Sequence, residues 1–175
     1  MKKINCVLVG LVFFTLVVNA TALAGSANRK GDGEILTSEE EAGLLFMREE
    51  EKLARDVYRV LYEKWELGVF DNIAQSEQRH MDAVLYLIGK YNLADPALDP
   101  GIFQNEELQA LYDDLVDKGL KSIVDAIEVG VIIEETDIAD IVALLDQTDK
   151  NDIIRVYTNL LDGSHNHLDA FNSHL

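Results

Sequence analysis

The chain has 175 residues and a formal net charge of −17, with 32 acidic against 15 basic residues. This length suits one domain with a buried core, and the charge argues against nucleic acid and anionic membrane surfaces as partners. The single cysteine, Cys6, lies in an N-terminal segment expected to be removed. Its removal would exclude disulfides, thiolate metal sites and thiol nucleophiles. The acidic charge is compatible with attracting cations, although solubility is its more common reason.

The first 24 residues have the pattern of a secretory signal peptide. A basic start, Met1–Lys3, precedes an apolar stretch over residues 4–18, and small residues at positions 22 and 24 form a cleavage site. Cleavage after Ala24 would export the protein to the periplasm or the cell exterior. It would also take the net charge to −19, because both lysines of the start are lost. The alternative is an uncleaved membrane anchor, since no further charge occurs before Arg29.

The folded domain is predicted over residues 37–175, after a glycine-rich polar stretch at residues 25–36 that is typical of a flexible linker. Apolar residues then recur in steps of three and four, which predicts a first helix from about residue 38 to residue 65. The stripe consists of Leu44, Met47, Ala54, Tyr58, Leu61 and Trp65. Glu51 occupies the one gap in this stripe.

A second helix is predicted from about Phe70 to Tyr91, and it carries two polar residues on its apolar face. Glu77 and His80 are three residues apart, so they share one side of the helix. The other residues on that side are apolar: Phe70, Ile73, Ala74, Met81, Val84, Leu87, Ile88 and Tyr91. A carboxylate and an imidazole directed into a core are unfavourable without compensation, and a metal ion is a common form of compensation.

The only two prolines, Pro96 and Pro100, lie in the connection that follows, and no stretch alternates in the way a strand does. A short helix is predicted over residues 105–117. Two further long helices are predicted, over about residues 120–145 and 151–174. Two helical hairpins joined by one long crossover predict an all-α fold with ferritin-like connectivity, namely a four-helix bundle whose crossover carries a short extra helix.

Polar residues interrupt the apolar face near the middle of each long helix, where the four helices would meet. They are Glu51, Glu77, His80, Glu134, Ser164 and His167. Carboxylates combined with one or two imidazoles suit iron or manganese. Ferritin-like di-metal proteins use a glutamate from each of two helices and a Glu-x-x-His motif from each of the other two.

Four segments carry a resemblance to known proteins: Met47–Tyr58, Ser76–Ala83, Ile133–Ile138 and Gly163–Leu168. Through them the chain resembles the ferritin-like superfamily and, within it, the uncharacterised exported family DUF2202. It also resembles rubrerythrin-like proteins, in which a metal-ligating glutamate is followed by alanine at +3 and tyrosine at +7. Glu51, Ala54 and Tyr58 have that spacing, and the second-helix Glu-x-x-His is present as well.

The fourth helix departs from the ferritin-like pattern, because Ser164 stands where the pattern has a glutamate. Asp137 is a candidate replacement, since it shares a helix face with Glu134 and rubrerythrin-like proteins carry a second carboxylate one turn along that helix. The resemblance implies a site for two ions, or for one ion with fewer ligands. Its ligands would be Glu51, Glu77, His80, Glu134, Asp137 and His167. A redox-active metal there would react with oxygen or peroxide, as in an oxidoreductase.

Two points stay open at the level of sequence. Acidic runs are usually solvated, and the neighbours Glu50 and Glu135 are alternatives to the favoured glutamates. The second hypothesis is a non-catalytic helical envelope protein, in which Arg55 or Arg79 neutralises the buried carboxylates within a structural network that needs no metal.

The expected partners are metal ions and further copies of the chain, with no nucleic acid and, after signal cleavage, no membrane.

Overall fold

The computed structural model describes residues 35–175, so the predicted signal peptide and the predicted linker up to residue 34 lie outside the described residues. This part of the chain forms five helices and no strand, as the all-α prediction requires. The helices are α1 (Ser38–Trp65), α2 (Gly68–Lys90), α3 (Glu106–Gly119), α4 (Ile123–Leu145) and α5 (Asn151–Asn172). Every predicted helix is present, with both ends within three residues of the expected positions.

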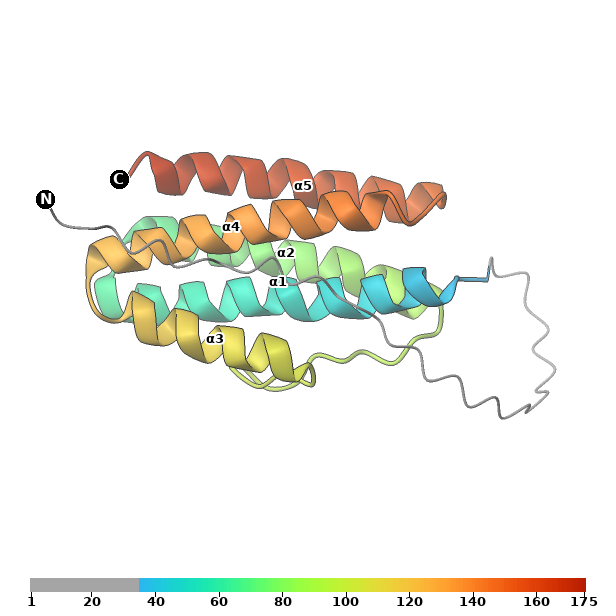
Figure 1. Ribbon diagram of the computed structural model, residues 1–175, viewed down its shortest axis with the longest axis horizontal. Coiled ribbons are helices and arrows are strands. Elements are labelled where there is room, and N and C mark those ends of the chain that lie inside the picture. The colour runs from blue at the N-terminus through green and yellow to red at the C-terminus, as the bar shows by residue number, and fades with distance from the viewer. Residues whose placement is uncertain (1–34) are drawn as a thin grey trace, which may run out of the picture. The chain divides into compact units, whose positions relative to one another are not determined.

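The four long helices lie side by side as two hairpins, α1 with α2 and α4 with α5 (Figure 1). The connections within the hairpins are short, which makes the joined helices antiparallel neighbours. The hairpins pack with α1 against α4 and α2 against α5, and the short α3 contacts α1 and α4 from outside. None of the helices within residues 35–175 is both long and apolar enough to span a membrane.

Helix α1 is the most enclosed helix, and it is buried without interruption from Met47 to Tyr58. One side of α1 faces α2 and α4, while the crossover and α3 cover the other side. The crossover is fixed to α1 by charged side chains. Glu49 accepts the backbone N–H of Gln104 at 2.6 Å, and Asp56 accepts that of Gly101 at 3.0 Å. The acidic run of α1 is therefore not a solvated face.

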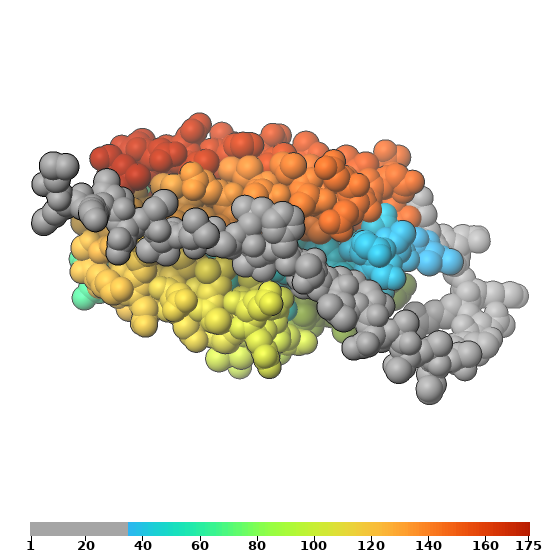
Figure 2. Space-filling model, viewed as in Figure 1, coloured from blue at the N-terminus to red at the C-terminus, as the bar shows by residue number. Residues whose placement is uncertain are grey.

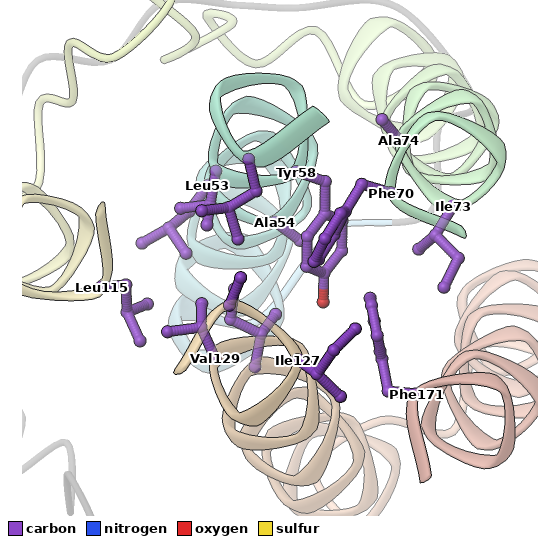
Figure 3. Packing of buried hydrophobic residues seen from close by; sticks show 14 of the residues in the cluster. Leu53, Ala54, Tyr58, Phe70, Ile73, Ala74, Leu115, Ile127, Val129 and Phe171 are labelled. Atoms are coloured by element: carbon purple, nitrogen blue, oxygen red, sulfur yellow. The ribbon is translucent and has the colours of Figure 1, made fainter. Parts of the chain in front are cut away.

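Two apolar clusters fill the core, and a polar layer separates them along every long helix. One cluster contains buried apolar residues of α1, α2, α4 and α5, namely Leu53, Ala54, Val57, Tyr58, Leu61, Phe70, Ile73, Ala74, Ala126, Ile127, Val129, Ile133 and Phe171. Figure 3 shows its centre, where the rings of Tyr58, Phe70 and Phe171 converge. The ring centroids of Tyr58 and Phe171 are 5.2 Å apart, and burial of each such ring contributes about 2 kcal/mol.

The second cluster contains residues from the opposite ends of the same helices: Leu44, Met47, Val84, Leu87, Ile88, Ile141, Ile153, Val156, Tyr157 and Leu160. Along each long helix, the residues predicted as metal ligands lie between the residues of one cluster and those of the other. The apolar layers on both sides therefore hold these polar side chains at one level of the structure and limit the access of water.

Candidate metal centre

The six predicted ligands come together from α1, α2, α4 and α5. Five of them are buried, with exposed fractions of 1 % for Glu51, 2 % for Glu77, 1 % for Glu134, 6 % for Asp137 and 8 % for His167. The side chain of the sixth, His80, is 12 % exposed. The neighbouring Glu135 is exposed, so Glu134 is the member of that pair that faces the core.

The first group of ligand atoms belongs to Glu51, Glu77 and His80. The Nδ1 atom of His80 lies 2.8 Å from Oε2 of Glu77 and 3.2 Å from Oε2 of Glu51. The i,i+3 spacing of Glu77 and His80 brings their side chains together on α2, while α1 supplies Glu51. All ligand atoms of this group lie within 4.8 Å of one another.

The second group belongs to Glu77, Glu134 and His167 and is equally compact. The Nδ1 atom of His167 lies 2.8 Å from Oε1 of Glu77 and 3.5 Å from Oε2 of Glu134. Glu77 thus belongs to both groups and turns one oxygen toward each histidine. The two imidazole rings are stacked, with centroids 5.5 Å apart.

These distances match the spacing of ligands around an ion. Metal bonds of about 2.1 Å to nitrogen and oxygen place neighbouring ligand atoms about 3 Å apart. Hydrogen bonding explains the contacts less well, because each Nδ1 carries at most one hydrogen and yet faces two carboxylates. Moreover, Oε1 of Glu51 is buried without a hydrogen-bond partner among the described residues, and the 2.8 Å contact between Nδ1 of His167 and Oε1 of Glu77 lacks the geometry of a hydrogen bond. The donor set therefore fits a metal ion.

The sixth predicted ligand, Asp137, stands beside the two groups and belongs to neither of them. The hydroxyl of Ser164 donates a hydrogen bond to Oδ2 of Asp137, and Oδ1 is buried without a hydrogen-bond partner among the described residues. Ser164 thus orients Asp137, the carboxylate that the sequence analysis proposes in place of the glutamate missing at position 164. On the other side, the Tyr58 hydroxyl donates to Oε1 of Glu134 at 2.6 Å and leaves Oε2 directed toward His167.

The arginines that could have neutralised the centre lie elsewhere. Arg55 forms a 2.7 Å salt bridge with Asp56 and donates to Gln78, and Arg79 is exposed. Every lysine or arginine salt bridge within residues 35–175 goes to a carboxylate outside the six candidate ligands. Among the described residues, only the two histidines offset the negative charge of the centre by direct contact.

Glycine at position 163 is a feature of the site that periodicity could not single out. A Cβ atom on Gly163 would lie 2.6 Å from both Nε2 and Cε1 of His80. A side chain there would force the imidazole away from Glu77, so the close approach of α5 to α2 depends on this glycine.

Residues 40–175 match the family described as "Uncharacterized protein domain (DUF2202)". The chain belongs to the DUF2202 family. It is 55 % identical over 138 residues to the uncharacterized protein MJ0754 of Methanocaldococcus jannaschii, across 78 % of this chain and 75 % of that protein. The predicted family is thereby confirmed.

Two solved structures resemble this DUF2202 domain. The crystal structure of hypothetical protein MJ0754 from Methanococcus jannaschii DSM 2661 has a TM-score of 0.77 and 52 % identity, over 84 % of this chain and 83 % of that one. The crystal structure of a DUF305 fragment from Deinococcus radiodurans has a TM-score of 0.66 at 12 % identity, over 80 % of this chain and 97 % of that one. The second likeness concerns the helical fold alone.

Burial and mutual charge shift the protonation of the DUF2202 centre. Burial, together with the charge of Glu77, raises the pKa of Glu134 to about 8, and burial raises that of Asp137 to about 7. Burial would lower the pKa of both histidines, but the carboxylates facing them raise it to about 11 for His80 and about 9 for His167. Burial would raise the pKa of Glu77, yet the two histidines lower it to about 2.

The metal-free DUF2202 domain is expected to be most stable on the acidic side of neutrality. The pKa of His167 is raised from 6.5 to about 9, so its stabilising contribution is complete below pH 6.5 and is lost as the pH rises through 9. The pKa of Glu134 is raised from 4.5 to about 8, so in this range the folded protein keeps a proton that the unfolded chain loses. The free energy of unfolding therefore falls as the pH rises from 4.5 to about 8. The pKa of Glu77 is lowered from 4.5 to about 2, so its contribution is lost only as the pH falls through that interval.

Urea unfolding of the metal-free protein should therefore give a lower free energy of unfolding near pH 9 than near about pH 5.5. Replacement of the exposed His165 by glutamine should leave this dependence unchanged, because that side chain lies outside the centre. A free energy of unfolding that rises between the two pH values would contradict the assigned charges.

Proposed function

We propose that this DUF2202 protein is an exported, ferritin-like four-helix protein that binds two iron or manganese ions between its helices. The observation that carries the proposal is the position of Glu77, which directs one carboxylate oxygen at the Nδ1 atom of each of two histidines. A carboxylate between two such groups can bridge two cations. The N-terminal sequence pattern supports export.

Each ion would have its own histidine and its own terminal carboxylate. Glu51 and His80 would hold one ion, Glu134 and His167 would hold the other, and Glu77 would be shared. The free Oδ1 of Asp137 offers one further ligand. Two divalent cations would offset the charge of a centre that is rich in carboxylates and that forms no salt bridge with a lysine or arginine of residues 35–175.

Bound iron or manganese would supply redox chemistry with oxygen or peroxide. The chain's own residues would set the conditions for it. The two apolar clusters limit the access of water to the centre. The hydrogen bond from Tyr58 fixes the orientation of Glu134, as outer-shell partners of metal ligands commonly do.

Elemental analysis after loading with manganese(II) or iron(II) tests the proposal. The wild-type protein should retain two ions per chain after desalting, and His80→Ala should retain one at most. The matched control is His165→Ala, an exposed histidine two residues from His167, which should retain both ions. Absence of bound metal in the wild type would instead favour the structural network, for which the 3.2 Å contact between His80 Nδ1 and Glu51 is suited.

A further inference from the structure

A second group of carboxylates extends from the proposed centre toward the protein surface. Along α4, Glu134, Asp137 and Asp140 recur every three residues, which places each side chain close to the next. The exposed fraction is 1 % at Glu134 and 6 % at Asp137, and Asp140 is half-buried. The series thus begins among the metal ligands and ends at the solvent.

Glu50 of α1 faces this series, although its position next to Glu51 would suggest that only one of the two glutamates points inward. Only 7 % of Glu50 is exposed, and its Oε2 atom is buried without a hydrogen-bond partner among the described residues. Burial, followed by the charges of Asp137 and Asp140, raises the pKa of Glu50 well above its ordinary value, and Glu50 also shares a side-chain hydrogen bond with Asp140. Glu50 therefore lies between the surface and the centre.

Within residues 35–175, no lysine or arginine forms a salt bridge with these carboxylates. The salt bridges of the neighbouring Arg48 and Lys52 go to Asp95 and Asp56. A buried carboxylate oxygen without a donor is unfavourable, and two such oxygens occur here, one on Glu50 and one on Asp137, whose charges act on each other. Both oxygens would be satisfied by a cation that passes between α1 and α4.

We propose that Asp140, Glu50 and Asp137 form an uptake route along which divalent cations move from the surface to the metal centre. This inference rests on the proposed function. A route fits the geometry better than a third permanent site. Within residues 35–175 only the two histidine-containing groups bring three ligand atoms within 4.8 Å of one another. The carboxylates of the route therefore hold an ion more loosely than the centre does, and they pass it on to Glu51.

The test compares the rate of metal loading with the final metal content. The intact protein is mixed with iron(II) in the absence of oxygen, unbound iron is trapped with a ferrous chelator at timed intervals, and the final content is measured by elemental analysis. We expect Asp140→Asn and Glu50→Gln to slow loading at least about tenfold, because carboxylates that line a path raise the local cation concentration. Both variants should still bind two ions at equilibrium.

Glu135→Gln is the matched control, since it removes one negative charge from the exposed side of the same helix and should load at the wild-type rate. If the wild type takes up no metal, the proposed function and the route both fail. If the wild type binds two ions and both variants load at its rate, the route alone is overturned. Loss of an ion from either variant at equilibrium would also overturn it, because the residue would then belong to the centre.

Discussion

Replacement of Glu77 by glutamine is expected to abolish the binding of both metal ions, although glutamine has nearly the same shape. Glu77 lies 2.8 Å from the Nδ1 atom of each histidine and is the one residue that both groups share. The amide is neutral and keeps only one carbonyl oxygen, so it cannot bridge two cations as a carboxylate does. The dissociation constant of each ion should rise at least about 100-fold, since even outer-shell changes reach this size.

Isothermal titration with manganese(II) measures this effect directly. Glu135→Gln, a similar substitution at an exposed position of α4, should bind both ions with the affinity of the wild type. Circular dichroism should show that Glu77→Gln remains helical, so that the loss of binding is not a loss of fold. Tight binding of one ion by a folded Glu77→Gln protein would mean that the carboxylate is not shared.

Binding of two metal ions is expected to raise the melting temperature of the protein by about 25 °C. A ligand present at about 1,000 times its dissociation constant stabilises the folded state by about 4 kcal/mol per site. In a domain of this size about 1 kcal/mol corresponds to roughly 3 °C. The unfolded chain cannot match this binding, because the ligands of each ion are separated by many residues, as between Glu77 and Glu134.

Calorimetric melting of the protein with manganese(II), with magnesium(II) and after chelation measures this shift. Magnesium should have a much smaller effect, since it prefers oxygen ligands and retains its water, whereas each site here contains an imidazole. The Glu77→Gln protein should melt at the same temperature with and without manganese. Equal melting temperatures for loaded and chelated wild type would argue for a metal-independent network.

The contact between Ser164 and Asp137 shows how much of the site residue patterns can predict. The pattern identified the missing glutamate on α5 and proposed Asp137 as its replacement from the i,i+3 spacing with Glu134. In the structure the serine hydroxyl donates to Asp137, so the residue at the departing position 164 is in contact with the candidate replacement for the missing glutamate. Spacing along one helix placed Asp137 on the correct face, but it could not show which side chain of α5 would meet it.

Glu50 and Arg55 illustrate what patterns could not decide. Both lie in a charged run of α1, where one polar side is normally solvated. Packing between α1 and α4 buries Glu50 together with Glu51, and Arg55 is held by Asp56, which the crossover covers, instead of by the metal ligands. The residues that cover α1 are distant from it in sequence, so the helical periodicity of α1 cannot predict this burial.

The sequence by itself determined the number, order and approximate ends of the helices, and the pairs that share a helix face, because these follow from local backbone geometry. It also placed polar residues at the same level of four helices. Only the tertiary structure decided that Glu77 faces both His80 and His167 and that Asp140 extends the carboxylates to the surface. The rotation and depth of each helix are set by side-chain packing between neighbouring helices, and that packing is a property of the whole fold.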